Sequence, residues 1–275
     1  SLVSTLSFSS RYRKWHAGVC LRASHNPAKY NGYKVYGSDG CQITSEMAKE
    51  VSDAIAKTDV FEGVKRMSFE DGVKEGRISY IKDEVINAFL QEVLNQSVIP
   101  EPCKGLKVVY TPLNGSGRVC VTRILDMIGV DDVTVGPEQE VPDGHFTTCP
   151  FPNPEVKEAL QKGLELSQKV QADLLVATDP DCDRCGIAVN QNGEYVLMSG
   201  NEVGVLLLDF IAQARIKNGK MPKNPVAVTT IVSTDMAGAP GKENSIRRRR
   251  GPTGLKYIRD QNASPQAAGP PRRPL

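Results

Sequence analysis

Short apolar runs alternate with amphipathic segments along most of this chain. A continuous apolar run is typical of a buried strand, whereas apolar residues three and four positions apart are typical of a helix with one buried face. These patterns predict strands at 17–21, 106–110, 133–135, 174–177, 186–189, 195–198 and 226–232. They predict helices that begin at Ser45, cover 83–97, 115–128 and 200–216, and extend from a cap at Asn153 to Val170.

Strands and helices that alternate in this way indicate an α/β fold with mixed, mainly parallel sheets sandwiched by helices. The strands at 186–189 and 195–198 are separated by Asn192 and Gly193, a pair typical of a tight hairpin turn. Residues 59–79 are polar and weakly patterned, so we expect a loop there. Beyond residue 240 the periodicity is lost, and four successive arginines followed by a Pro-rich end predict a tail that is either disordered or aberrant in sequence.

Charge divides the chain into two parts. The 34 Lys and Arg residues nearly balance the 32 Asp and Glu residues, but from position 241 onward there are nine basic and two acidic residues. The first 240 residues are therefore mildly acidic, which gives no support to a nucleic-acid partner. A mean hydropathy of −0.31 and the lack of a long apolar run exclude a membrane-spanning helix and a membrane partner.

The cysteines and the first residues of the chain indicate the cellular compartment of the protein. Seven cysteines are an odd number in a chain too large to need disulfide staples, so we expect reduced thiols. The first residues lack the charged-then-apolar pattern of a signal peptide. Both observations favour a cytoplasmic protein.

Three aspartates alternate directly after the strand expected at 174–177. In an extended loop Asp179, Asp181 and Asp183 point the same way, so their carboxylates can converge. Three carboxylates without histidine or thiolate partners favour Mg²⁺ over zinc or copper. Arg184 follows at once and offers a fixed cation for a phosphate bound to that metal.

The acidic loop at 179–184 has other interpretations. A solvated acidic turn is the simplest, although three alternating aspartates after a buried strand argue against it. A calcium EF-hand does not fit, because Arg184 stands where that loop needs glycine and Asn190 where it needs glutamate. The Asp-x-Asp pattern of an aspartyl-phosphate phosphatase stays open. We interpret Cys182 and Cys185 as incidental packing residues, since strong zinc or redox partners are absent from the pattern.

A second polar loop, Arg-Ala-Ser-His-Asn-Pro at 22–27, follows the strand expected at 17–21. The carboxyl edge of a sheet is where α/β proteins place reacting groups. Ser24 is a candidate nucleophile or phosphoryl carrier, with His25 or Lys34 as candidates for moving protons. The same residues also make a good turn. A Ser-His-Asp hydrolase is disfavoured, because adjacent side chains point apart and no Gly-x-Ser-x-Gly elbow surrounds the serine.

The two loops together resemble those of the α-D-phosphohexomutase family. Residues 23–27 with Asn-Gly-Tyr-Lys-Val-Tyr at 31–36 look like the phosphoserine loop, and residues 179–184 look like the magnesium loop. Within the family the chain is most similar to bacterial phosphoglucomutase-like members, near the branch with phosphopentomutases. Further segments agree in type and order at 110–117, 142–146, 152–155, 199–204 and 253–258.

The resemblance implies the four-domain plan of that family, with only part of it present. We expect a partial first domain with the phosphoserine loop at 1–103 and a complete second domain with the metal loop at 104–193. The start of a third domain is expected at 194–240, and a divergent basic, Pro-rich tail at 241–275. On this interpretation the chain is truncated at both its N- and C-terminal ends, and little or no mutase turnover is expected from it.

The implied activity is a Mg²⁺-dependent phosphoglucomutase reaction between hexose 1-phosphate and hexose 6-phosphate. It runs through a phosphoserine and a bisphosphate intermediate, with glucose 1,6-bisphosphate as activator and a phosphosugar as the binding partner. The implied roles are catalysis by Ser24, His25, Lys34 and Arg184, metal binding by Ser24, Asp179, Asp181 and Asp183, and substrate binding by Arg184 and Lys256.

This assignment has two functional alternatives, and the sequence differs from the family pattern at two positions of interest. The sugar specificity could be that of a phosphomannomutase or a phosphopentomutase, or the chain could be a non-catalytic fragment that binds Mg²⁺ or phosphate. Arg22 stands where the family usually has threonine, and Asn114 where histidine is common. Arg22 lies next to the proposed phosphoserine loop, where it would either add a phosphate contact or misplace the loop.

Overall fold

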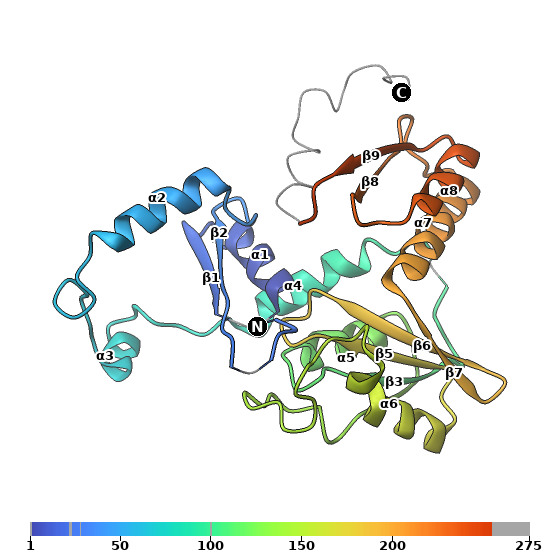
Figure 1. Cartoon of the computed structure of the whole chain (residues 1–275), viewed down its shortest axis with the longest axis horizontal. Helices are drawn as coiled ribbons and strands as arrows, with labels where there is room; N and C mark the ends of the chain where they lie inside the picture. Colours follow the sequence, from blue (N-terminus) through green and yellow to red (C-terminus); the bar gives the residue numbers. More distant parts are fainter. Residues whose placement is uncertain (1, 22–23, 28, 100, 255–275) are drawn as a thin grey trace.

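The computed structural model describes residues 2–21, 24–27, 29–99 and 101–254 (Figure 1). The largest sheet has the strand order β4-β3-β5-β6-β7. Its central strand β5 pairs in parallel with β3 and antiparallel with β6, while β4 and β7 form the two edges. The strands are β3 (Lys107–Thr111), β4 (Asp132–Val135), β5 (Leu174–Thr178), β6 (Cys185–Gln191) and β7 (Glu194–Met198).

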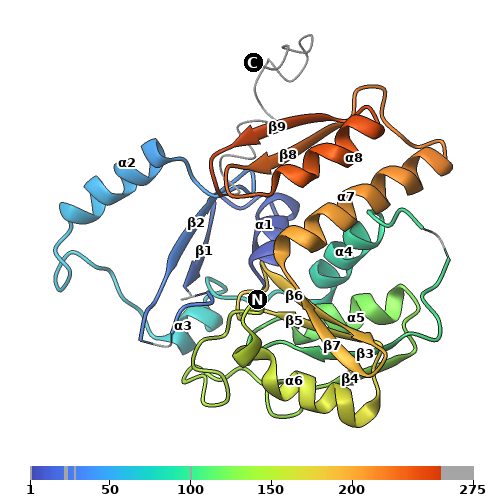
Figure 2. The same ribbon diagram turned by 45° about the vertical axis from the view of Figure 1, so that its right-hand side comes forward.

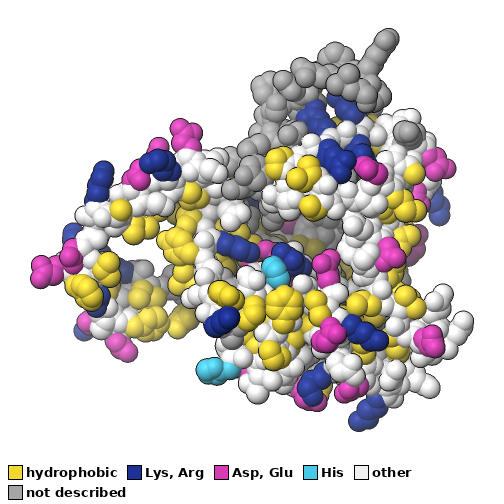
Figure 3. Space-filling model, viewed as in Figure 1, with side chains coloured by type: hydrophobic (Ala, Val, Ile, Leu, Met, Phe, Trp, Pro, Cys, Tyr) yellow, Lys and Arg dark blue, Asp and Glu magenta, His cyan; other side chains and the backbone are white. Residues whose placement is uncertain are grey.

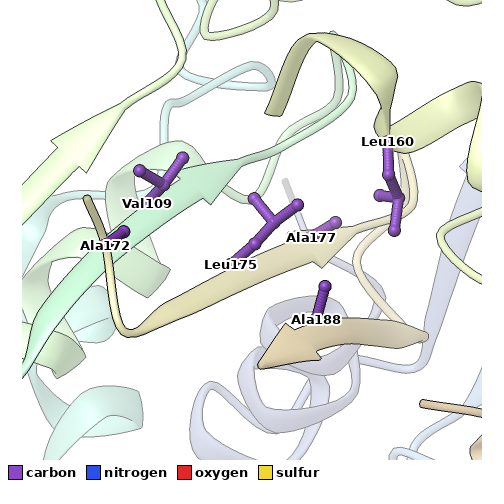
Figure 4. Close-up of a cluster of buried hydrophobic side chains, with 6 residues drawn as sticks. All are labelled: Val109, Leu160, Ala172, Leu175, Ala177 and Ala188. Carbon is purple, nitrogen blue, oxygen red and sulfur yellow. The ribbon is translucent and has the colours of Figure 1, made fainter. Parts of the chain in front are cut away.

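Helices cover this sheet because successive side chains on a strand point to opposite faces. Val109 of β3 points toward α6 (Lys157–Val170), whereas the neighbouring Tyr110 points toward the start of α5 (Arg118–Met127). The core under α6 is fully buried (Figure 4). Its members are Val109, Leu160, Ala172, Leu175, Ala177 and Ala188.

The N-terminal part of the chain builds a smaller unit on a two-stranded antiparallel sheet. Strand β1 (Ala17–Leu21) pairs with β2 (Tyr33–Gly37), and helix α1 (Val3–Tyr12) contacts both strands. Helix α4 (Asp83–Leu94) packs on α1 and on α5 and so joins this unit to the larger sheet (Figure 2). Helices α2 (Ser45–Ala56) and α3 (Phe69–Lys74) extend away from it.

A third unit follows β7. Helix α7 (Gly200–Lys217) begins with a capping box in which Ser199 and Glu202 exchange side-chain and backbone hydrogen bonds. Strand β8 (Val226–Thr230) then pairs in parallel with β9 (Arg247–Gly251). The short helices η1 (Asp235–Ala237) and α8 (Gly238–Glu243) connect the two strands.

The α/β class, the mixed sheets and the flanking helices are confirmed, but the predicted excess of parallel pairing is not present in the described residues. Three strand pairs are parallel, and three are antiparallel. The turn at Asn192 and Gly193 joins β6 to β7, and a connection that short permits only antiparallel pairing.

Several element boundaries differ from the expectation. Helix α6 begins at Lys157, because residues 153–156 first form a turn in which the Asn153 side chain accepts from the Glu155 N–H. Helix α2 begins at Ser45 as expected, and Thr44 caps it by accepting a hydrogen bond from the Met47 N–H. The segment expected as a loop at 59–79 contains α3, and α1 went unpredicted because its inner face carries Thr5, Ser9 and Ser10.

The prediction of disorder beyond residue 240 is wrong for the part that the structure describes. The four arginines form β9, whose backbone pairs with β8. Arg248 and Arg250 both donate to Asp235 Oδ1, at 3.1 and 3.2 Å, which offsets part of their charge. Residues 255–275 lie outside the described part of the chain, and the proposed domain boundaries stay predictions.

Truncation of the core under α6 tests which packing stabilises the larger sheet. Leu175→Ala removes a fully buried side chain and should lower the free energy of unfolding by about 2–5 kcal/mol. The matched change Leu206→Ala removes an exposed side chain from α7 and should have a much smaller effect. Urea unfolding followed by circular dichroism compares the two variants, and equal losses would contradict this assignment of the core.

Candidate active site

The serine loop and the aspartate loop come from different units and meet at one point. Ser24 follows β1, and Asp179 follows β5 at the carboxyl end of that strand. The Oγ atom of Ser24 lies 3.0 Å from Asp179 Oδ2 and 2.9 Å from Asp181 Oδ1, so its proton is shared between two carboxylates. Two residues that are 155 positions apart in the chain are therefore in direct contact.

Lys34 reaches the same loop from β2. In the β1–β2 ladder it lies opposite Cys20, four residues before Ser24, so the hairpin brings lysine and serine to one side of the aspartates. Its Nζ atom donates to Asp181 Oδ2 at 2.8 Å and to Asp183 Oδ2 at 2.9 Å. Ser24 and Lys34 together thus contact all three aspartates.

The three aspartates form a compact cluster of oxygen ligands. Asp179 and Asp181 are fully buried, and one carboxylate oxygen from each of the three aspartates lies within 4.8 Å of the others. Asp179 Oδ1 also accepts hydrogen bonds from the backbone N–H groups of Asp183 and Arg184, both at 3.1 Å. This donor set, which is made of hard carboxylates in close reach, fits Mg²⁺.

Neighbouring backbone holds the aspartate loop in place. Ser116 donates to Pro180 O through its N–H at 2.9 Å and through its hydroxyl at 3.0 Å. The Val3 N–H of α1 donates to Asp181 O at 3.1 Å. A Cβ atom added to Gly115 would collide with the backbone of Pro180, so glycine is required for this close approach.

The serine loop and the aspartate loop each contain a non-glycine residue in the left-handed region. Ser24 has φ +55°, and Cys182, between two of the aspartates, has φ +56°. Such conformations are uncommon for residues with a side chain and are held only where the surroundings fix them. They turn the backbone sharply, so that the side chains on either side of Cys182 face one cluster.

Burial and ion pairing separate the pKa values of the two buried aspartates. Burial, together with the charge of Asp181, raises the pKa of Asp179 to about 7. Burial would also raise the pKa of Asp181, but the hydrogen bonds from Lys34 and its contact with Asp179 hold that pKa below its usual value. The pKa of Lys34 stays above its ordinary value, because its pairs with Asp181 and Asp183 outweigh the effect of burial.

His25 and Arg184 complete the group of polar side chains at the site. His25 Nδ1 lies 3.5 Å from Ser24 Oγ, and the edge of the imidazole contacts the ring of Phe151 at 6.4 Å between centroids. Burial and the positive charge of Arg184 lower the pKa of His25. Figure 3 shows basic, acidic and histidine side chains gathered in the hollow where the N-terminal unit meets the larger sheet. Behind this loop, Asp183 and Arg184 also line a cavity of about 670 Å³.

The structure thus brings together Ser24, His25, Lys34, Asp179, Asp181, Asp183 and Arg184. Lys256 and Arg22 lie outside the described residues. The residue pattern alone gave no role to Ser116, although the small residues Gly-Ser-Gly at 115–117 are a signal of close backbone packing. All seven cysteines lie within the described residues, and none of them is paired in a disulfide there.

Comparisons with known proteins agree with this geometry. Residues 2–61 match the profile of phosphoglucomutase/phosphomannomutase alpha/beta/alpha domain I, and residues 86–193 match that of domain II. A phosphoribomutase of Saccharomyces cerevisiae is 40% identical over 89% of this chain and 42% of its own length. A phosphoglucomutase of Staphylococcus aureus is 31% identical over 92% of this chain and 45% of its own length.

Solved structures show the same fold at low sequence identity. A phosphoglucomutase/phosphomannomutase family protein from Burkholderia thailandensis matches with a TM-score of 0.64 and 18% identity over 90% of this chain and 47% of that chain. The N-acetylphosphoglucosamine mutase of Aspergillus fumigatus, in complex with GlcNAc-6P and magnesium, matches with a TM-score of 0.57 and 15% identity over 94% of this chain and 61% of that chain.

The chain belongs to the phosphoglucomutase/phosphomannomutase family, the α-D-phosphohexomutases, as its two polar loops indicated. It spans less than half the length of the two curated relatives. Within the residues that the structure describes, no helix is long and apolar enough to cross a membrane.

Loss of one carboxylate tests the metal assignment. Asp181→Asn keeps the shape of a buried ligand but removes its charge, so we predict that Mg²⁺ affinity falls by at least about tenfold. Asp126→Asn removes an exposed carboxylate from α5 and should leave the affinity unchanged. Isothermal titration calorimetry measures both variants, and circular dichroism verifies that they fold. Unchanged affinity in a folded Asp181→Asn variant would exclude Asp181 as a ligand.

The raised pKa of Asp179 predicts a pH-dependent metal affinity. A proton and Mg²⁺ compete for this carboxylate, so acidification below its pKa of about 7 must weaken binding. We predict about a tenfold loss of affinity from about pH 8 to about pH 6, together with proton release on binding at neutral pH. Calorimetry in two buffers of different ionisation enthalpy measures the released protons. An affinity that stays constant over this interval would contradict the prediction.

Proposed function

We propose that this chain carries the phosphoryl-transfer site of a phosphosugar mutase, with Ser24 as the phosphoryl carrier. The observation that carries the proposal is the contact of Ser24 Oγ with Asp179 and Asp181, beside Lys34. A hydroxyl at the carboxyl edge of a sheet, next to a magnesium-type ligand set, suits phosphoryl transfer rather than acyl transfer.

The carboxylates of Asp179, Asp181 and Asp183, with an oxygen on Ser24, would hold the Mg²⁺ ion. When bound, Mg²⁺ supplies positive charge that offsets the negative charge of a phosphoryl group in transfer. The structure of the Aspergillus fumigatus relative in complex with magnesium supports this choice of ion.

The remaining residues have roles that follow from their positions. Ser24 Oγ gives up its proton and forms a bond to phosphorus while the bond from phosphorus to a sugar oxygen breaks, and that sugar oxygen takes up a proton. The proton that leaves Ser24 replaces the one that the sugar oxygen takes, so the transfer is balanced. Lys34 is placed to donate this proton and to recover it when phosphoserine returns the group to a sugar hydroxyl. Arg184 would bind the substrate phosphate, His25 would orient Ser24, and Lys256 would add a phosphate contact.

The sugar is proposed as a pentose or hexose phosphate. The phosphoribomutase of Saccharomyces cerevisiae is 40% identical to this chain, and the phosphoglucomutase of Staphylococcus aureus is 31% identical. The relatives of this chain thus include one mutase named for a pentose and one named for a hexose. A 1,6-bisphosphate of glucose or a 1,5-bisphosphate of ribose would then be the activating donor. A phosphatase with Asp179 or Asp181 as nucleophile is less favoured, because Ser24, Lys34 and backbone amides already occupy these carboxylates.

Phosphorylation of the chain tests this proposal directly. The protein is incubated with Mg²⁺ and either glucose 1,6-bisphosphate or ribose 1,5-bisphosphate, and peptides are analysed by mass spectrometry. We expect one phosphate on Ser24, its loss in Ser24→Ala, and its retention in Ser52→Ala, which changes an exposed serine of α2. Interconversion of the sugar phosphates is measured in the same samples.

The alternatives give different results in this experiment. An acid-stable phosphate on serine with a preference for one donor supports the mutase and identifies its sugar class. A hydroxylamine-sensitive phosphate on Asp179 or Asp181 would replace the proposal with a phosphatase. A folded chain that binds Mg²⁺ and stays unmodified with both donors would leave only a binding role.

A further inference from the structure

The ammonium group of Lys34 binds carboxylate oxygens that a metal ion would also need as ligands. Its Nζ atom lies 2.8 Å from Asp181 Oδ2 and 2.9 Å from Asp183 Oδ2, and these aspartates are two of the three in the cluster. Ammonium and Mg²⁺ are both compact, strongly hydrated cations that carboxylates bind through oxygen. One cluster of oxygens therefore has two competing cations.

The charges explain why a lysine is held there. Asp179 and Asp181 are fully buried within 4.8 Å of Asp183, and like charges at that separation repel one another. The ammonium group of Lys34 offsets part of this repulsion. A divalent ion offsets more of it, because it carries twice the charge and can contact all three carboxylates.

The Lys34 ammonium group can move from the aspartates into solvent. Its side chain is 24% exposed, whereas the side chain of Asp181 beneath it is fully buried, so the ammonium group lies on the open side of the cluster. The flexible four-carbon stem of lysine lets the charged end turn toward solvent while its base stays in β2. Ser24 contacts the other oxygen of the same carboxylate, Asp181 Oδ1, and His25 lies beside Ser24.

We infer that Lys34 and Mg²⁺ exchange at the aspartate cluster: the metal displaces the Lys34 ammonium from Asp181 and Asp183 and releases it toward the substrate. Lys34 is then the counter-ion of the site without metal and a free proton-transfer group in the site with metal. This inference rests on the proposed function, because it takes the three aspartates as the Mg²⁺ ligands.

Chemical labelling of lysines measures the exchange without any enzyme assay. The full chain is treated with an amine-acylating reagent, with Mg²⁺ or with EDTA, and the rate of modification of each lysine is followed by peptide mass spectrometry. Lys34 should react several-fold faster in Mg²⁺, since its two ion pairs are then broken. Lys29, an exposed lysine of the same hairpin, is the internal control and should react at one rate in both conditions.

Metal affinity of variants gives a second measurement. Lys34→Met removes the competing charge, so Mg²⁺ should bind about tenfold more tightly, equivalent to the loss of one charge-assisted hydrogen bond that the metal must break. Lys34→Arg keeps a competing charge and should stay near the natural chain, as should Lys29→Met. A purely structural role for Lys34 predicts the opposite change, because a disturbed site binds metal more weakly.

The outcomes separate the exchange from the proposed function. Faster labelling of Lys34 and tighter binding in Lys34→Met support the exchange. If the natural chain binds Mg²⁺ but Lys34 labelling is unchanged, or if Lys34→Met binds more weakly, the exchange is overturned and the phosphoryl-transfer proposal stands. If the natural chain binds no Mg²⁺, the metal assignment and the exchange are both overturned.

Discussion

The close burial of carboxylates after β5 is the constraint on which the rest of this structure depends. Charged groups that leave water lose hydration energy, which must be offset by hydrogen bonds or counter-ions. Here the offset comes from three separate parts of the chain: the hydroxyl of Ser24, the ammonium group of Lys34, and the backbone amides of the aspartate loop itself. The N-terminal unit is therefore held against the larger sheet by the same contacts that form the candidate site.

The periodicity of the sequence predicted most strands and helices after residue 83, because their buried faces are apolar. Apolar periodicity did not predict helix α1, because its inner face carries hydroxyl side chains such as Ser9 and Ser10. Apolar periodicity did not predict strand β9 either, because what holds its arginines extended is backbone pairing with β8 and contact with Asp235. In α1 the apolar positions Val3 and Leu6 are too few among these hydroxyl side chains to mark a helix, and the four arginines of β9 include no apolar residue.

The candidate site was only partly predictable. Alternating aspartates after an apolar run are a local pattern, and the sequence alone indicated a magnesium site there. Ser24 contacts Asp181 across 157 positions of the chain, and Lys34 contacts Asp181 across 147. No local pattern encodes such contacts. Resemblance to the family suggested the first of them. The double ion pair of Lys34 was not predicted, because an isolated lysine in a hairpin is usually a solvated one.

Helix α1 donates a hydrogen bond from Val3 to the backbone of Asp181, while α4 packs between α1 and α5. The aspartate loop thus connects two bodies, the N-terminal unit and the larger sheet with its helices. Any ion that binds only the folded loop adds its binding free energy to the association of both bodies. Occupancy of the site should consequently couple the unfolding of the two bodies more tightly, so that the heat capacity curve of this chain reports how full the site is.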